Sequence, residues 1–323
     1  MVSYIVRRLF SCLVLIILVS MVVFVLVRAM PGDPLLMILS PEDLAAVAGD
    51  DVQAHLDALR AEHGLDRPIV VQYMNWLLDV VRGDFGRSIV RGFDIASELQ
   101  SRMTVTLFLG TIAFVISNIL GMFLGTISAI RRGKIIDTVV TTIANIGMTA
   151  PSFLIAILCI YIFGFRLRIF PIFGFQLPWD GDFSRSLNQM VMPIFVMMLG
   201  PMASTARQTR SSVLEVLNED HVRTAWAKGM AEKIIIFRHV LKNALIPVIS
   251  LQGAMLRGIF GGSAIIEQIF VIPGAGQMMV QAMLSSDYPV IQAVTIMLTF
   301  VAVLSNLLVD ILYGWVDPRI QYS

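Results

Sequence analysis

Long runs of apolar residues constrain this chain more than any other feature of its sequence. Leu9–Val27 contains no charged residue over 19 positions, and a helix needs about 20 apolar residues to cross the roughly 30 Å core of a bilayer. Apolar residues make up 57% of the chain and charged residues 15%, against about 45–50% and about 25% in soluble domains. The chain is therefore expected to be an all-α polytopic membrane protein.

Six segments have the length and composition of membrane-spanning helices. The fourth is the shortest, and Pro193, Gly200 and Pro201 interrupt it; inside a bundle such interruptions are tolerated because neighbouring helices satisfy the freed backbone groups. The first is longer than the apolar region of a secretory signal, which is about 7–15 residues, so an uncleaved span is expected. The six predicted spans are 9–27, 104–130, 135–164, 190–206, 245–270 and 290–313.

The distribution of Lys and Arg predicts the orientation of these spans. With the N-terminus inside, the short cytoplasmic segments carry 13 of the 24 Lys and Arg residues, whereas the short external loops carry only Arg166, Arg168 and Arg185. Cytoplasmic loops of membrane proteins are enriched in these residues. Both termini are therefore predicted to be cytoplasmic, although Arg166 and Arg168 depart locally from the rule.

The long segment 28–103 between the first two spans contains helical patterns. Asp50 is a candidate N-cap for a helix that Gly64 and Pro68 would end. A second helix is predicted over 69–81, where apolar residues recur at helical spacing. Two interpretations of these helices stay open: they pack against the outer end of the bundle, or they form a docking surface for an external partner.

Several classes of function lack the residues that they require. The net charge of +1 offers no basic excess for a nucleic-acid partner. Cys12 and Cys159 lie inside apolar runs, and without a CxxC or Cys/His cluster neither a metal nor another cofactor is expected. The phosphate-binding motif GxxxxGK[ST] is absent, since Gly133 and Lys134 are followed by Ile135. The chain is expected to bind no nucleotide itself.

The segment 207–244, between the fourth and fifth spans, is the most informative loop. Ser212 precedes Glu215 by three residues, which is the spacing of a capping box. A short helix is predicted over 220–228, and Gly229 is predicted to end it in the left-handed conformation.

This short helix places Ala225 on one side together with Lys228 and Gly229. Small residues on such a helix would allow it to approach a groove on another protein closely. From the residues alone, a solvated loop with no partner is the competing interpretation.

The stretch Arg223-Thr-Ala-Trp-Ala-Lys-Gly229 resembles the EAA loop of binding-protein-dependent ABC importer permeases. More narrowly, the chain resembles the first (B-type) subunit of the dipeptide/oligopeptide branch. The resemblance continues in order through Pro31-Gly-Asp-Pro34, Gly83-Asp-Phe-Gly-Arg-Ser88, His239-Val-Leu-Lys-Asn-Ala-Leu-Ile-Pro247 and Pro273-Gly-Ala-Gly276. The chain departs from the pattern at Trp226, where that branch commonly has a basic residue, and at Arg257, which lies in a region that is usually apolar or small in relatives.

The resemblance implies a fold and a domain organisation. Residues 104–313 would form the ABC type I (MetI-like) permease domain, with 1–103 as an N-terminal span plus an external helical segment and 314–323 as a cytoplasmic tail. The loop 207–244 would carry the coupling helix, which docks on a cytosolic ATPase. The coupling residues implied are Arg223, Thr224, Ala225, Trp226, Ala227, Lys228 and Gly229.

The resemblance also implies partners and a location. The chain would pair with a second, homologous permease subunit, two cytosolic ATP-binding subunits and an extracytoplasmic solute-binding protein. All would assemble at the inner (plasma) membrane of a bacterium. Dipeptides or oligopeptides are the expected substrates, with glutathione, nickel complexes or sugars as alternatives carried by the same machinery.

Arg257 and Glu267 lie in or near the fifth predicted span and are candidates for the translocation path. A charge at the centre of the bilayer costs at least about 2.5–3.5 kcal/mol, so each is expected to face the bundle or water. The two are about 15 Å apart along a helix, which argues against a mutual ion pair. A structural partner for Arg257, and an anchoring role for Glu267 before the Pro273-Gly274 turn, are the competing interpretations.

Two other classes of function compete with an ABC permease. A gradient-driven secondary transporter predicts an internal repeat and discontinuous helices around ionisable groups near the midplane of the bilayer. No repeat is apparent, and Arg257 alone is a thin basis for that class. An intramembrane enzyme would need a catalytic set, and neither HExxH nor GxSxG occurs in the sequence.

Overall fold

The computed structural model describes residues 2–29 and 66–316, where the regular elements are all helices. The helix that Asp50 was predicted to begin lies outside these residues. In chain order the elements are α1 (Val2–Ala29), α5 (Ile69–Val81), α6 (Ile95–Ile130), α7 (Ile135–Thr149), α8 (Ser152–Cys159), η1 (Ile160–Arg166), α9 (Phe183–Leu217), α10 (Asp220–Ala227), α11 (Glu232–Ile234), η2 (Ile235–Val240), α12 (Leu241–Ile269), α13 (Ala275–Leu284) and α14 (Tyr288–Val316).

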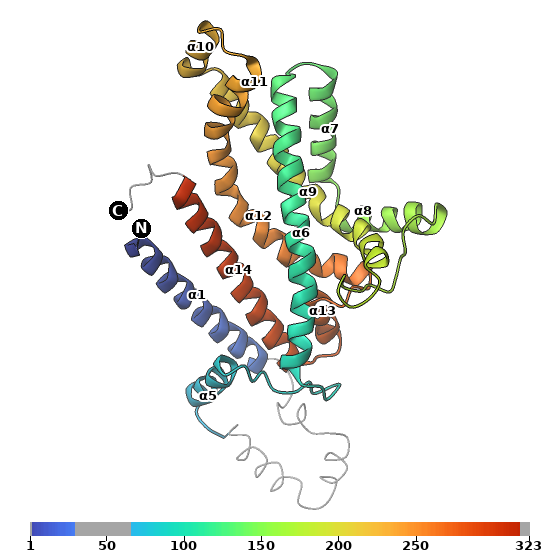
Figure 1. Ribbon diagram of the computed structural model, residues 1–323. Coiled ribbons are helices and arrows are strands. Elements are labelled where there is room, and N and C mark those ends of the chain that lie inside the picture. Colours follow the sequence, from blue (N-terminus) through green and yellow to red (C-terminus); the bar gives the residue numbers. More distant parts are fainter. Residues whose placement is uncertain (1, 30–65, 317–323) are drawn as a thin grey trace, which may run out of the picture.

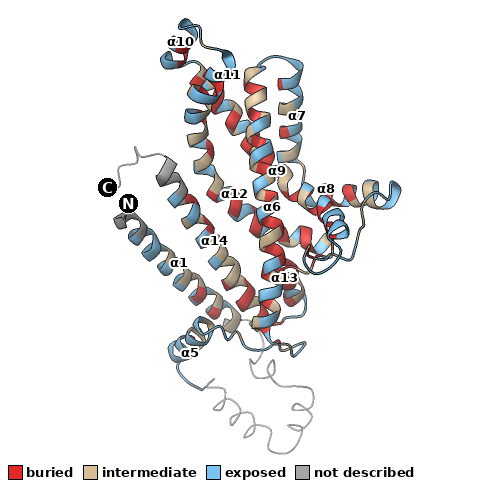
Figure 2. Ribbon diagram, viewed as in Figure 1, coloured by how far each residue is buried: buried red, intermediate tan, exposed pale blue. Residues whose placement is uncertain are grey.

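The long helices form one bundle (Figure 1). Helix α9 packs against both α6 and α12, and α1 packs against α14 on one flank. The short helices α10 and α11 lie at one end of the bundle, whereas α13 and α5 lie towards the other end. Buried residues concentrate where the long helices face one another, and the outward face of α1 is exposed (Figure 2).

Helix α5 has the bounds that the sequence predicts, 69–81, and it packs on the end of α1. The hydroxyl groups of Tyr73 and Ser20 are 2.8 Å apart, and the ring of Phe24 lies edge-on to that of Tyr73 at 5.5 Å. The structure thus supplies the packing contact that one interpretation expected. Docking of an external partner on the exposed face of α5 stays a prediction.

Among the described residues, five helices are long and apolar enough to cross a membrane, and a bent helix pair makes a sixth span if it counts as one. The six predicted spans therefore match in number, but several bounds were wrong. The second span begins at Ile95 rather than at 104, because Asp94 caps the helix by accepting a hydrogen bond from the N–H of Ser97 at 3.0 Å.

The fourth span was predicted too short. Helix α9 runs unbroken over 35 residues and contains both Pro193 and Pro201, as packed membrane helices can. It begins at Phe183 rather than at 190, because Asp182 accepts hydrogen bonds from the first N–H groups. It also continues to Leu217, so the first third of the predicted loop 207–244 is helix.

The capping box predicted at Ser212 is therefore wrong. Ser212 is buried inside α9, where the backbone N–H groups are bonded within the helix and no cap is needed. The next helix, α10, starts after Glu219, whose side chain makes no capping hydrogen bond. The spacing alone was misleading because it could not show that the helix continued through the serine.

The third predicted span, 135–164, is not straight. Helix α7 ends at Thr149 and α8 begins at Ser152, and the pair is bent by 105° at this break. Ala150 has an extended backbone, with φ −71° and ψ 129°, as expected for a residue before proline, because Pro151 disfavours the helical conformation of its predecessor. Figure 1 shows α8 running sideways from the lower end of α7.

Candidate functional site

Helix α10 forms as the sequence predicts and lies at the end of the bundle (Figure 1). It spans Asp220–Ala227, and Lys228 is its C-cap. Gly229 follows with φ +72°, the left-handed conformation that glycine adopts without steric cost. The N–H of Gly229 donates to the carbonyl of Trp226, and that of Met230 donates to the carbonyl of Ala225, which closes the helix end.

The inward face of α10 differs from the expectation for Ala225. This residue is only 5% exposed and packs with Val222 into an apolar cluster. The cluster also contains residues of α6, α9, η2 and α12, namely Ala129, Val213, Val216, Ile235, Val240 and Ala244. Ala225 lies three residues after Val222 and so shares its face. Its small side chain fits this chain's own core rather than an outside groove.

The outward face of α10 carries the remaining residues of the implied coupling set. Arg223, Thr224, Trp226, Ala227, Lys228 and Gly229 are all exposed. The indole of Trp226 is 46% exposed. The exposed face therefore combines two cations, an aromatic ring and the free space around Gly229, where an added Cβ would meet nothing within 4 Å.

Polar contacts fix α10 to the helices beside it. The imidazole Nδ1 of His221 lies 3.0 Å from the carboxylate of Glu219, and its Nε2 lies 3.4 Å from the carbonyl oxygen of His239 and from the amide nitrogen of Asn243. These contacts join the start of α10 to η2 and α12. Together with the apolar cluster, they make α10 a fixed extension of α9 and α12.

A buried ion pair, not foreseen from the sequence, ties three helices together near α10. The guanidinium of Arg210 on α9 donates to both carboxylate oxygens of Asp137 on α7, at 2.7 and 2.9 Å. The hydroxyl of Ser128 on α6 and the N–H of Gly133 also donate to Asp137, at 2.5 and 3.0 Å. The predictive feature was Asp137 in the first turn of an apolar helix, where a charge needs a partner.

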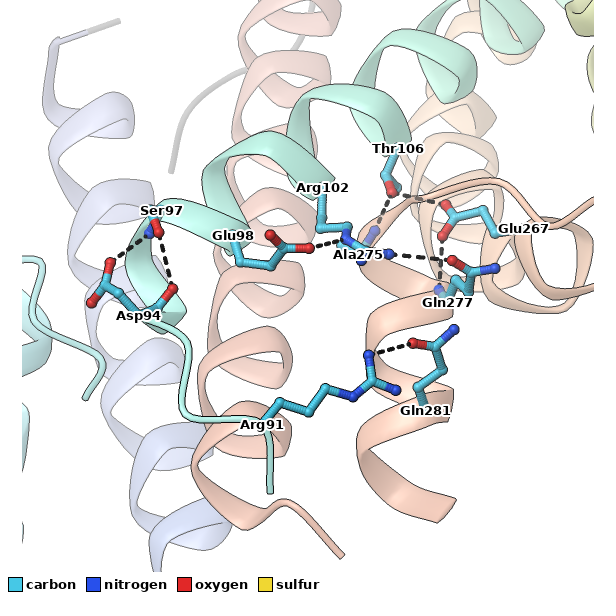
Figure 3. A network of polar contacts seen from close by, with 10 residues as sticks. All are labelled: Arg91, Asp94, Ser97, Glu98, Arg102, Thr106, Glu267, Ala275, Gln277 and Gln281. Atoms are coloured by element: carbon cyan, nitrogen blue, oxygen red, sulfur yellow. Dashed lines mark hydrogen bonds and ion pairs between the residues drawn. The ribbon is translucent and has the colours of Figure 1, made fainter. Parts of the chain in front are cut away.

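Glu267 lies at the opposite end of the bundle and anchors α13 (Figure 3). Its carboxylate is 1% exposed and accepts hydrogen bonds from the hydroxyl of Thr106, at 2.8 Å, and from the N–H of Gln277, at 2.9 Å. Thr106 in turn accepts from the N–H of Ala275. The orphan N–H groups of the first turn of α13 are thus satisfied from α6 and α12. This arrangement agrees with the anchoring role; a role in the translocation path stays a prediction.

The same network extends along α6 (Figure 3). Arg102 donates to the side chains of Glu98, at 2.7 Å, and Gln277, at 3.2 Å. Arg91 reaches Gln281 on α13 at 3.5 Å. These contacts hold α13 against the first turns of α6.

Arg257 is exposed and, within the described residues, forms neither a hydrogen bond nor an ion pair with another side chain. It lines a pocket of about 260 Å³ together with residues of α1 and α14, among them Arg8, Ser11 and Asn306. The partner of Glu267 is Thr106, as the argument against a mutual pair expected. That Arg257 lies on the translocation path stays a prediction.

A second, larger cavity of about 350 Å³ lies where α7, α8, α9 and α12 meet. It includes the break between α7 and α8 and has no charged residue in its lining. Within the described part of the chain, no cluster of three His, Cys, Asp or Glu residues could hold a metal ion. The chemistry available in this cavity is therefore apolar contact and backbone hydrogen bonding.

Comparison with known families and relatives agrees over the whole chain. Residues 117–322 match the model of the binding-protein-dependent transport system inner membrane component, and residues 1–91 match its N-terminal model. The oligopeptide transport system permease protein AppB of Bacillus subtilis is 36% identical over 324 residues, which cover 100% of both chains. A putative peptide transport system permease of Brucella abortus is 35% identical with the same coverage.

Two solved structures have a similar fold. The MetNI methionine ABC transporter, in an inward-facing conformation, matches with a TM-score of 0.55 and 18% identity, over 68% of this chain and 96% of that one. An amino acid ABC transporter matches with a TM-score of 0.50 and 14% identity, over 69% of this chain and 94% of that one. At these identities the likeness shows a shared helical architecture.

Proposed function

The chain belongs to the family of binding-protein-dependent transport system inner membrane components and is a permease subunit of an ATP-driven importer, and on this premise we propose that it imports peptides and is driven through α10. The relatives that match over their full length are named as peptide or oligopeptide transport permeases, which supports peptides over glutathione, nickel complexes or sugars. A gradient-driven carrier would not need an exposed helix held rigidly at one end of the bundle.

The observation that carries the proposal is the two-sided character of α10. Its inner face, Val222 and Ala225, is built into the cluster that joins α9 and α12. Its outer face exposes Arg223, Trp226 and Lys228, where a partner protein can contact them. A partner that pushes on the outer face therefore moves two membrane-spanning helices at once, which is how an external energy source can shift a two-state bundle.

The partners follow from this arrangement and from the family. Two cytosolic ATP-binding subunits bind and hydrolyse ATP, and one of them docks on α10. A second, homologous permease supplies the other half of the path, and an extracytoplasmic solute-binding protein delivers the peptide. In this proposal α10 and both termini are on the cytoplasmic side of a bacterial inner membrane, and residues 104–313 form the permease domain.

Gly229→Leu tests the coupling role. A Cβ added there meets no atom within 4 Å, but the leucine must adopt φ near +72°, which costs roughly 1–2 kcal/mol and favours another end to α10. We expect ATP-driven peptide uptake by the reconstituted importer to fall at least about tenfold, the factor that 1.4 kcal/mol represents, while ATP hydrolysis and membrane insertion persist.

Gly92→Leu is the matched control. Gly92 also has a positive φ, +71°, and also has nothing within 4 Å of an added Cβ, but it lies just before α6 begins at Ile95, outside both α10 and the Asp137 network. Uptake should be near that of the wild type in this variant. Equal uptake by both variants would remove α10 from the mechanism, and uptake that continues when the partner ATPase is inactivated would refute ATP-driven import.

A further inference from the structure

The cavity between α7, α8, α9 and α12 has a distinctive lining. Its walls contain three methionines, Met148, Met197 and Met255, and several small residues, but no charged side chain. Thioether side chains are flexible and adapt to partners of different shape. A surface of this kind suits ligands whose side chains vary.

Backbone groups at the helix break supply the polar part of this lining. Pro151 has no N–H, so the carbonyl of Gly147, four residues earlier, lacks its helical donor. Within the described residues no other N–H or side chain donates to it. Gly200 lies opposite this carbonyl and has no side chain to cover it. A Cβ added at Gly200 would lie 3.8 Å from the carbonyl oxygen of Gly147.

The other side of the break offers a donor. Ser152 is the first residue of α8, and the first four N–H groups of a helix have no partner within it. Pro151, the N-cap, makes no side-chain capping bond, and within the described backbone the N–H of Ser152 donates to no carbonyl. Gly147 and Ser152 both line the cavity, so an acceptor and a donor lie at the same break.

Helix α9 contributes a second acceptor by the same covalent rule. Pro201 lies inside α9 and cannot donate to the carbonyl of Met197, four residues before it. Met197 and Pro201 both line the cavity. Pro151, at the break between α7 and α8, and Pro201, inside α9, thus each leave one carbonyl in the cavity wall without a helical donor.

Lipid chains are poor occupants for such a cavity. Acyl chains cannot hydrogen-bond, and irregular backbone at membrane depth is tolerated only where it is buried in protein or lines a water-filled space. The backbone groups of Gly147 and Ser152 therefore require water or a ligand with matching donors and acceptors. A peptide main chain carries one of each at every residue.

We propose that this cavity is a subsite that binds the main chain of a transported peptide, with peptide N–H groups donating to the carbonyls of Gly147 and Met197 and a peptide carbonyl accepting from the N–H of Ser152. The inference rests on the proposed import of peptides. Recognition of the main chain, with adaptable methionines around it, admits peptides of many sequences.

Gly258→Leu tests whether the cavity is occupied during transport. Gly258 lines the cavity, and an added Cβ there meets nothing within 4 Å, so a larger side chain at this position starts in open space and extends into the cavity. We expect uptake of trialanine by the complete importer in proteoliposomes to fall at least about tenfold, because the side chain takes up room that a peptide residue needs.

Gly261→Leu is the matched control. Gly261 lies on the same helix with equally open surroundings but does not line the cavity. Its uptake should stay within about twofold of wild type, the spread expected of a surface substitution. Wild-type uptake by Gly258→Leu, or equal loss in both variants, would overturn the subsite.

A second experiment tests the hydrogen bonds themselves. In the wild type, trialanine should be imported faster than its analogue with an N-methylated central amide, which lacks one donor. Pro201→Ala restores the helical donor for the carbonyl of Met197, so this preference should shrink by about fivefold, the worth of one hydrogen bond. The binding protein is the same in both complexes, so a change in the ratio belongs to the permease.

Pro193→Ala is the control for helix stiffening. It restores a hydrogen bond in the same helix, but Pro193 lies outside this cavity, and the preference should be unchanged. The subsite is contradicted if Pro201→Ala keeps the wild-type preference for trialanine over its N-methylated analogue, or if Pro201→Ala and Pro193→Ala change this preference equally. In either case the wild type would still import trialanine in an ATP-driven way, so the proposed function would stand. If the wild type imports no peptide, the proposed function fails instead.

Discussion

Polar groups near α10 have hydrogen-bond partners within the chain, whereas backbone groups at the cavity between α7, α8, α9 and α12 lack them among the described residues. Near α10, the carboxylate of Asp137 accepts hydrogen bonds from Arg210, Ser128 and Gly133. In the cavity, the carbonyl of Gly147 and the N–H of Ser152 have no partner among the described residues. One region is complete within the chain, and the other is not.

The difference separates transmission from binding. A fully satisfied buried network holds its helices in one arrangement, so a push on α10 can reach α7 and α9 without being absorbed locally. Unsatisfied backbone groups are costly unless something from outside pairs with them. An importer needs both kinds of region, because a partner supplies its energy and its substrate changes from one cycle to the next.

The largest effect is expected from breaking the complete region with Asp137→Ala. The change leaves the guanidinium of Arg210, which is 30% exposed, without its bidentate partner. Removing one member of a buried pair costs about 3–5 kcal/mol, and partial exposure of Arg210 favours the lower end. The measurement is the apparent free energy of unfolding in detergent.

Asp220→Ala is the control for this prediction. Asp220 and Arg223 also form an ion pair, at 3.7 Å, but their side chains are 99% and 70% exposed. Exposed pairs contribute little, so unfolding should not change measurably. If the two variants unfold alike, the ion pair at Asp137 does not hold the helices together.

A smaller effect is expected from disturbing the contact between α6 and α9 with Gly125→Ala. An added Cβ would collide with the carbonyl oxygen of Ala206 and would lie 2.7 Å from the Cβ of Thr209. Overpacking of this kind typically costs about 1–3 kcal/mol. The same unfolding measurement checks it, and a neutral result would show that α6 and α9 can move apart easily.

The sequence predicted the features that depend on neighbours along the chain. The number of spans follows from long apolar runs, and α5 follows from helical spacing over 69–81. The end of α10 at Gly229 follows from the conformational freedom of glycine. Each of these features is determined by local backbone geometry and by the apolar interior of the bilayer.

The features that the sequence analysis missed depend on what each helix packs against. Pro201 continues a helix whereas Pro151 ends one, and only the surrounding bundle distinguishes the two. Asp137 meets Arg210 across 73 positions of sequence, which no spacing rule reveals. Ala225 was expected to face a groove on another protein, but it lies on the same buried face as Val222. The sequence did not show which side of this short helix packs against the bundle.

The smallest effect is expected from Gly258→Ala, at the cavity between α7, α8, α9 and α12. This substitution should raise stability, whereas the two changes above should lower it. Nothing lies within 4 Å of the added Cβ, so the substitution adds no collision and removes the entropic disadvantage of glycine inside a helix. Alanine should therefore stabilise α12 by about 0.5–1 kcal/mol, measured by unfolding in detergent beside Gly125→Ala. Both substitutions add one methyl group to a long helix, and they should change stability in opposite directions. If Gly258→Ala destabilises the chain as Gly125→Ala does, the helices close over the cavity in solution, and the contrast between a packed end and an open site is lost.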